Sequence, residues 1–264
     1  MKRNGSITAL VCLGIVILIS GCRSTPATGL SPATDVNPGE KTTVLHTRSG
    51  VSVGVIYNIV SDAPASVVLL PGGNGVLSQN NRNFLLRVRD EFVERGLSIA
   101  VPNVPSDHSY GLDLGFRASA EHAQDLAAVI DFLRNASPGP VWLVGTSNGT
   151  ISATNAGARL GPSRVEGLVL TSTVWAHGDF SGLAKIFVPT LVVHNRSDGC
   201  RWSPYSGVSY GLGLLSNAPA KELISVQGGR SEGDACGAMS PHGYLGIEDQ
   251  VVPAIIQWIK RHTS

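Results

Sequence analysis

Residues 141–149, Val-Trp-Leu-Val-Gly-Thr-Ser-Asn-Gly, decide the fold of this chain. The first four residues are all apolar, and a short run that is apolar on both faces is typical of a parallel strand covered by helices on both sides. A helix-compatible stretch follows as far as about Leu160. The segment therefore predicts a strand, a sharp turn at Ser147 and a helix.

The same alternation of strands and helices extends in both directions from this segment. Apolar patterns predict a hairpin across 44–57, strands at 67–70, 97–101, 165–170, 190–194 and 222–226, and helices through 85–92, 126–133 and 252–259. Such an order predicts an α/β fold: a three-layer, doubly wound, mostly parallel sheet. We find no internal repeat and expect one domain over residues 42–264.

Composition excludes two broad classes of protein. The chain has 264 residues, of which 42% are hydrophobic and 15% are charged, and its net charge is +1. Disordered chains are less apolar and more charged, and nucleic-acid-binding proteins need a basic patch, which these scattered lysines and arginines do not supply. We therefore expect a globular domain that binds no nucleic acid.

The first 21 residues have the pattern of an export signal. Lys2 and Arg3 precede an apolar stretch at 7–19 that is short for a membrane span. Small residues directly before Cys22 resemble the lipobox of bacterial lipoproteins, which implies cleavage before Cys22 and a lipid on its sulfur. An ordinary cleaved signal and an uncleaved anchor are the alternatives.

Residues 22–41 are rich in Ser, Thr, Pro and Gly without periodicity, which indicates a flexible tether between lipid and domain. The lipoprotein resemblance places the domain in the cell envelope, outside the cytoplasm and anchored to a membrane. Arg23 after the cysteine would suggest the outer membrane if the host is Gram-negative.

Two cysteines remain after export and lipidation, because Cys12 leaves with the signal peptide. Cys200 and Cys236 would then face an oxidising compartment, and we predict that they form a disulfide. Zinc ligands usually come in closely spaced pairs, which these two cysteines lack. We expect neither a metal nor an organic cofactor.

The pattern Gly-x-Ser-x-Gly occurs twice, around Ser147 and around Ser209. A nucleophilic serine of this kind needs a strand before it and a helix after it. Only Ser147 has both, because no strand pattern precedes Ser209. The segment around Ser147 resembles the nucleophile elbow of the α/β-hydrolase superfamily, and the order of elements is similar from residue 44 to the end of the chain.

This resemblance implies a catalytic triad in the chain order serine, acid, histidine. Asp198 follows the strand at 190–194 and matches the acid, with Asp234 as the runner-up. His242 lies between the final strand and the final helix and matches the base. The other histidines are poorly placed, because they precede Ser147, precede Asp198 or lie at the end of the chain: His46, His108, His122, His177, His194 and His262.

The resemblance also implies an oxyanion hole made of two backbone amides. One would come from Asn148 and the other from Gly73, with Asn74 as the alternative. Many esterases have His-Gly-Gly where this chain has Pro71-Gly72-Gly73. The missing histidine need not matter, because the donor is a main-chain amide.

Only residues 172–188 separate the two strands between which this superfamily usually inserts a lid. We therefore expect no large cap domain and an open cleft. Trp175 and Phe180 are candidates to line a substrate pocket, although packing in the core is an equal alternative.

The function that these residues favour is cleavage of a carboxylic ester through an acyl-enzyme, with Ser147 as nucleophile. Thioesterase, peptidase and acyltransferase activity would use the same groups. The alternative outside the enzymes is an envelope lipoprotein that keeps the fold but catalyses no reaction.

Overall fold

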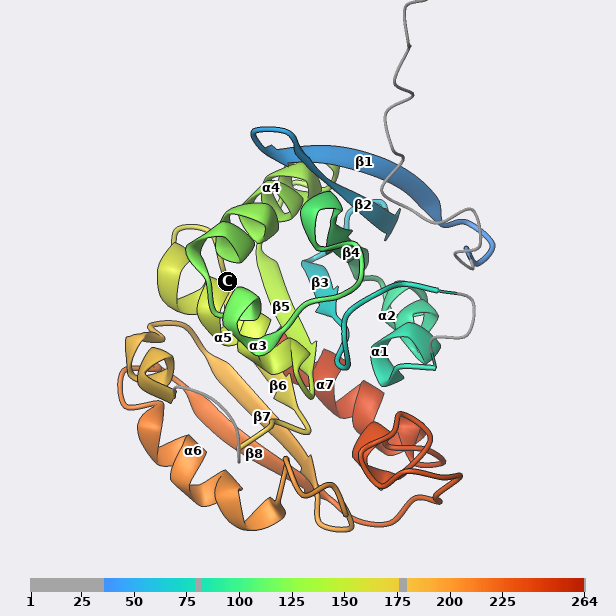
Figure 1. Ribbon diagram of the computed structural model, residues 1–264, viewed down its shortest axis with the longest axis vertical. Coiled ribbons are helices and arrows are strands. Elements are labelled where there is room, and N and C mark those ends of the chain that lie inside the picture. Colours follow the sequence, from blue (N-terminus) through green and yellow to red (C-terminus); the bar gives the residue numbers. More distant parts are fainter. Residues whose placement is uncertain (1–35, 79–81, 176–179, 264) are drawn as a thin grey trace, which may run out of the picture.

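The computed structural model describes residues 36–78, 82–175 and 180–263 (Figure 1). The expected signal peptide, the expected lipid site Cys22 and most of the expected tether lie outside these residues. The described fold begins close to Glu40, a buried residue that forms an ion pair with Arg89. Within the described ranges no helix combines the length and the apolar character that crossing a bilayer requires.

One eight-stranded sheet forms the centre of the molecule, in the order β1-β2-β4-β3-β5-β6-β7-β8. β1 pairs antiparallel with β2, and β2 antiparallel with β4, whereas all other pairs are parallel. The strands are β1 (Lys41–Arg48), β2 (Val51–Asn58), β3 (Ser66–Leu70), β4 (Ser98–Pro105), β5 (Val141–Thr146), β6 (Gly167–Thr171), β7 (Thr190–Asn195) and β8 (Lys221–Val226). The expected hairpin and mostly parallel sheet are confirmed.

Helices cover both faces of the sheet, which gives the three expected layers (Figure 1). One face carries α1 (Phe84–Arg87), α2 (Arg89–Glu94) and α7 (Glu248–His262), and the other carries α4 (Ala120–Ala136), α5 (Gly149–Leu160) and α6 (Val208–Leu214). The remaining short helices are α3 (Leu114–Arg117), η1 (Ser106–His108), η2 (Phe180–Lys185), η3 (Tyr205–Gly207) and η4 (Pro241–Gly243). Between β6 and β7 the described residues contain only η2, so the expectation of no large cap is confirmed.

Two apolar cores follow from the alternation of side chains along each strand. In β5, Trp142 and Val144 enter the core beneath α7, whereas Val141 and Leu143 enter the core beneath α4 and α5. All four are fully buried. The central strands are therefore apolar on both faces, as the sequence pattern indicates, and only their ends carry polar side chains.

The structure differs from the sequence prediction in the segment before β4. The helix expected through 85–92 is two helices, α1 and α2, that meet at Val88, whose φ of −107° and ψ of 6° leave the helical region. This break directs the buried Arg89 toward Glu40. Val88 is buried like the apolar residues on either side of it, so the apolar residues keep a helical spacing across the break. The sequence pattern therefore does not reveal the break.

Candidate active site

Ser147 lies in the turn between β5 and α5, with a φ of 52°. Its amide donates a hydrogen bond to the carbonyl of Thr171 in β6. A Cβ on Gly149 would lie 2.0 Å from the carbonyl oxygen of Leu70, and a Cβ on Gly145 would lie 2.5 Å from the oxygen of Gly149. The glycines on both sides of Ser147 are therefore required by the close approach of α5 to β3 and β5.

Ser147 and His242 line the same open pocket, of about 400 Å³, at the carboxyl ends of the parallel strands. This edge of an open α/β sheet is where such proteins bind ligands. The other lining residues come from the turn after β3, from the start of α1, from the end of β5 and from the loop after β8: Gly72, Gly73, Asn74, Val76, Ser78, Asn83, Phe84, Thr146, Cys236, Gly237, Ala238 and Gly243.

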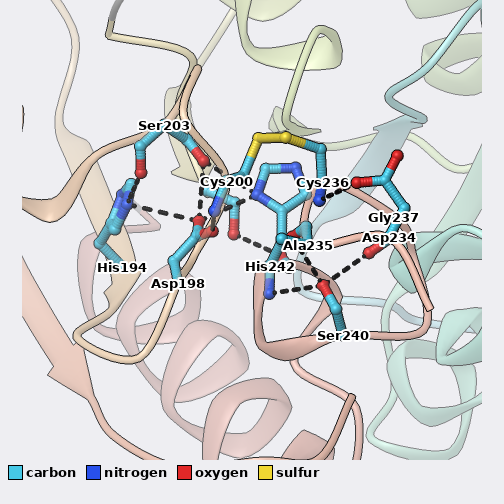
Figure 2. The surroundings of a disulfide bond; sticks show 11 residues. His194, Asp198, Cys200, Ser203, Asp234, Ala235, Cys236, Gly237, Ser240 and His242 are labelled. Carbon is cyan, nitrogen blue, oxygen red and sulfur yellow. Dashed lines mark hydrogen bonds and ion pairs between the residues drawn. A yellow bond between two sulfur atoms is a disulfide. The ribbon is translucent and has the colours of Figure 1, made fainter. Parts of the chain in front are cut away.

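The imidazole of His242 is held by a buried carboxylate (Figure 2). Its Nδ1 lies 2.9 Å from Oδ2 of Asp198, and both side chains are almost completely buried. A carboxylate can only accept, so Nδ1 carries the proton and Nε2 is the unprotonated nitrogen of the neutral ring. Within the described residues Nε2 has no hydrogen-bond partner. The ring thus has one nitrogen bound to the carboxylate and one nitrogen without a hydrogen bond.

Ser203 also contacts this pair, which the sequence did not indicate. Its Oγ donates to Oδ2 of Asp198 at 2.8 Å and lies 2.9 Å from Nδ1 of His242, so the imidazole proton is shared between two oxygens. The amide of Cys200 donates to the other carboxylate oxygen at 2.8 Å. Asp198 therefore accepts hydrogen bonds on both of its carboxylate oxygens.

A second buried imidazole lies on the far side of the carboxylate. Nε2 of His194 donates to the carbonyl of Ser203 at 2.9 Å and lies 3.6 Å from Oδ2 of Asp198. Burial lowers the pKa of His194, so this ring is neutral and does not compete with His242 for the charge of Asp198. The sequence analysis set His194 aside as a base, and the structure places it on the side of Asp198 that faces away from His242 (Figure 2).

Buried polar groups hold the loop that carries His242. The Oγ of Ser172 donates to the carbonyl of His242 at 2.7 Å, and the amide of Ser172 donates to the hydroxyl of Tyr244 at 3.0 Å. That hydroxyl donates to the carbonyl of Val193, and burial raises its pKa. Asn195 donates to the carbonyl of Pro241. The ends of β6 and β7 thus fix the position of the imidazole.

The disulfide between Cys200 and Cys236 joins the loop of Asp198 to the loop of His242, as the sequence predicts (Figure 2). Cys236 also lines the pocket. The alternative acid, Asp234, accepts a hydrogen bond from the amide of Cys236 at 2.9 Å and makes no ion pair with His242. The geometry therefore favours Asp198 over Asp234 as the partner of the imidazole.

The turn after β3 lies against the serine. A Cβ on Gly72 would lie 2.8 Å from Cβ of Ser147, and the carbonyl of Gly72 accepts a hydrogen bond from the amide of Gly75. The side chain of Asn148 donates to the carbonyl of Gly73 at 3.1 Å. In the described part of the chain, the amides of Gly73, Asn74 and Asn148 donate to no acceptor.

The second Gly-x-Ser-x-Gly pattern has a different role. Ser209 is exposed on α6. Its flanking glycines, Gly207 and Gly211, pack against the side chain of Trp175. A Cβ added at Gly207 would lie 2.7 Å from Cβ of Trp175, and one added at Gly211 would lie 2.0 Å from its indole ring. Trp175 is thus a core residue outside the pocket. The side chain of the other pocket candidate, Phe180, lies outside the described residues.

Solved structures similar to this one belong to hydrolases. A cold-adapted esterase from an Arctic intertidal metagenomic library has a TM-score of 0.62 at 17% identity, over 89% of this chain and 99% of that one. An α/β serine hydrolase without a lid from Xanthomonas campestris has a TM-score of 0.64 at 18% identity, over 88% and 98%. An α/β serine hydrolase homologue from Coxiella burnetii has a TM-score of 0.60 at 17% identity, over 83% and 97%.

No protein-family model matches the sequence, and no curated protein matches it.

Proposed function

On the premise that this chain has the α/β-hydrolase fold, we propose that it is a serine hydrolase that cleaves a carboxylic ester through an acyl-enzyme. The observation that carries the proposal is the state of His242. Its Nδ1 is bound to a buried carboxylate, and its Nε2 is unpartnered beside a pocket that also contains Ser147. A general base needs a fixed ring with one free nitrogen next to the nucleophile.

In the proposed reaction, Oγ of Ser147 attacks the ester carbonyl while Nε2 of His242 takes the hydroxyl proton. Asp198 keeps the ring in the correct tautomer and stabilises its protonated form. His242 then gives the proton to the leaving alcohol, and the acyl group stays on Ser147. Water attacks the acyl-enzyme in the same way and releases the acid. The amides of Asn148 and Gly73 would stabilise the oxyanion in both steps.

The pocket favours neutral substrates. Among its described lining residues, His242 is the only titratable side chain that faces the cavity, because Cys236 is oxidised in the disulfide. Val76, Phe84 and Ala238 provide apolar surface, and Asn74 and Asn83 provide amides. A charged acyl group would lose its hydration there without gaining a counter-ion. We therefore expect esters with uncharged acyl groups to be the better substrates.

Export and lipid anchoring complete the proposal, on the basis of residues 1–22. A disulfide beside the site is in keeping with an oxidising compartment. Metabolic labelling with palmitate should mark the full-length chain, and Cys22→Ser should abolish the label and release the protein from the membrane fraction. Continued labelling of the Cys22→Ser variant would refute the assignment.

A fluorophosphonate probe tests the catalytic proposal without knowledge of the substrate. The wild-type chain should be labelled, Ser147→Ala should not, and the exposed Ser209→Ala should be labelled like the wild type. A series of p-nitrophenyl esters of increasing acyl length, with thioester and peptide substrates in parallel, would then define the reaction. A wild-type chain that neither reacts with the probe nor hydrolyses any of these substrates would support the non-catalytic alternative.

A further inference from the structure

Arg117, the last residue of α3, is a buried cation that lacks a carboxylate partner. Only 1% of its surface is exposed, and within the described residues it forms no ion pair. The comparable arginines differ, because Arg89 pairs with Glu40, and Arg48 pairs with Asp107 and Asp125. Burying an unpaired charge is costly, so its position requires an explanation.

The guanidinium of Arg117 lies behind the turn that follows β3. Its Nη2 donates to the carbonyl of Pro71 at 3.3 Å and to the carbonyl of Gly73 at 3.2 Å. Its Nη1 donates to Oγ of Ser152 at 2.9 Å, and Ser152 belongs to α5, the helix that follows Ser147. Arg117 therefore connects the turn to the nucleophile helix.

The charge of this group is retained at neutral pH. Burial lowers the pKa of Arg117 to about 10, which still leaves the guanidinium protonated. The neighbouring His122 is neutral, because burial, and then the charge of Arg117, lower its pKa to about 3. A single fixed positive charge therefore lies beside the turn.

The hydrogen bonds of Arg117 also set the direction of the nearby amides. In a trans peptide the N–H points away from the carbonyl. The carbonyls of Pro71 and Gly73 are bound by Arg117, and the carbonyl of Gly72 is bound by the amide of Gly75. All three peptides are thus held through their carbonyls: Arg117 holds the peptide whose N–H belongs to Asn74, and the bond from Gly75 holds the peptide whose N–H belongs to Gly73. Within the described residues neither of these two amides donates a hydrogen bond.

We propose that Arg117 is a positioning residue for the oxyanion hole: it orients the turn after β3, and its unpaired charge is compensated when the oxyanion forms. The inference rests on the proposed serine hydrolase function. Before reaction the cation donates only to neutral oxygens, two carbonyls and the hydroxyl of Ser152, and in the transition state a negative oxygen would develop near the same turn. An interaction that strengthens in this way lowers the barrier rather than the Michaelis constant.

Three variants separate charge from packing. Arg117→Lys keeps the cation, and Arg117→Gln keeps a donor without charge. Arg89→Gln removes a buried cation that does not line the pocket. For each we would measure kcat and KM with p-nitrophenyl acetate, the rate constant for fluorophosphonate labelling, and the affinity for a boronic acid. A boronic acid forms an anionic tetrahedral adduct with the serine and so reports on oxyanion stabilisation.

We expect Arg117→Gln to lower kcat, the labelling rate and the boronate affinity about 10- to 100-fold, with KM within about threefold of the wild type. Arg117→Lys should stay within about tenfold of the wild type and above Arg117→Gln. Arg89→Gln should lower only the melting temperature.

The inference is overturned if a folded Arg117→Gln variant matches the wild type, or if the lysine and glutamine variants lose the same amount. If Arg117→Gln does not fold, the lysine variant decides: activity within about tenfold of the wild type supports the inference, and a larger loss overturns it. A wild-type chain without fluorophosphonate labelling would instead refute the proposed function itself, so the two failures are distinguishable.

Discussion

Ser203 donates a hydrogen bond of 2.8 Å to the buried carboxylate of Asp198, five positions earlier in the chain. The same hydroxyl lies 2.9 Å from Nδ1 of His242. A side chain that contacts both members of an acid–base pair restrains their relative orientation. The proposed base is therefore positioned by two oxygens rather than by one.

Removing this hydroxyl should slow the reaction without changing substrate binding. We expect Ser203→Ala to lower kcat about 10- to 100-fold at nearly constant KM, because a hydrogen bond to a charged group is lost in a buried site. Steady-state kinetics on a p-nitrophenyl ester would measure this. Ser203→Thr should restore part of the activity, and Ser206→Ala, on the exposed part of the same loop, should behave like the wild type. Unchanged kcat in Ser203→Ala would remove Ser203 from the site.

The identity of the acid can be tested with a matched pair of substitutions. Asp198→Asn should lower kcat by about 10³- to 10⁴-fold, because an amide in this position favours the wrong tautomer of His242. Asp234→Asn should have little effect, since the carboxylate of Asp234 only accepts a hydrogen bond from a loop amide. The opposite ranking in kcat would assign the acid to Asp234.

Much of this arrangement could be predicted from the sequence. The strands were recognisable because burial on both faces requires continuous apolar runs, as in 141–144. Ser147 was recognisable because only its Gly-x-Ser-x-Gly motif lies between a strand and a helix. Chain order favoured Asp198 and His242, which the structure brings to 2.9 Å.

The residues that were missed act through three-dimensional contacts with no local signal. Ser203 and Arg117 lie in segments without apolar periodicity, and His194 lies at the end of a strand whose apolar pattern says nothing of its partners. The contacts of all three form only in the folded chain. The same reason explains why α3 and α6 were not expected. α3 has four residues, and Gly211 of α6 serves the packing of Trp175 rather than the helix itself.

The disulfide should affect stability and activity together. The double variant Cys200→Ala/Cys236→Ser should lower the free energy of unfolding by about 3–4 kcal/mol, because the unfolded chain regains the freedom of a long closed loop. It should also lower kcat, since the bond holds in place the segment whose main-chain amide at Cys200 donates to Asp198, and Cys236 lines the pocket. Denaturant unfolding and ester hydrolysis, each with and without reductant, would measure both effects. A variant that is less stable but fully active would show that the link between the two loops is not needed for catalysis.

Stability should fall as the solution becomes mildly acidic. Burial lowers the pKa of His122 to about 3, whereas an unfolded histidine has a pKa of about 6.5. Between these values the unfolded chain takes up a proton that the folded chain does not. The free energy of unfolding should therefore decrease with falling pH, by at most about 1.4 kcal/mol per pH unit for this residue. Burial shifts His194 in the same direction.

Urea unfolding at pH 7.5, 6.5 and 5.5 would measure this dependence, in a range where most carboxylates stay ionised. His122→Asn should reduce the slope, whereas His46→Asn should not, because His46 is exposed on β1. An unchanged slope in His122→Asn would contradict the assignment.

The backbone conformation of Ser147 should lower the stability of the fold. With a φ of 52°, the residue occupies a conformation that costs a side-chain-bearing residue on the order of 1–2 kcal/mol and costs glycine almost nothing. Ser147→Gly should therefore melt at a higher temperature than the wild type, while Ser147→Ala keeps the strain. The chain holds a hydroxyl where folding alone would favour glycine, so the substitution that removes the proposed nucleophile is also expected to raise the stability of the fold.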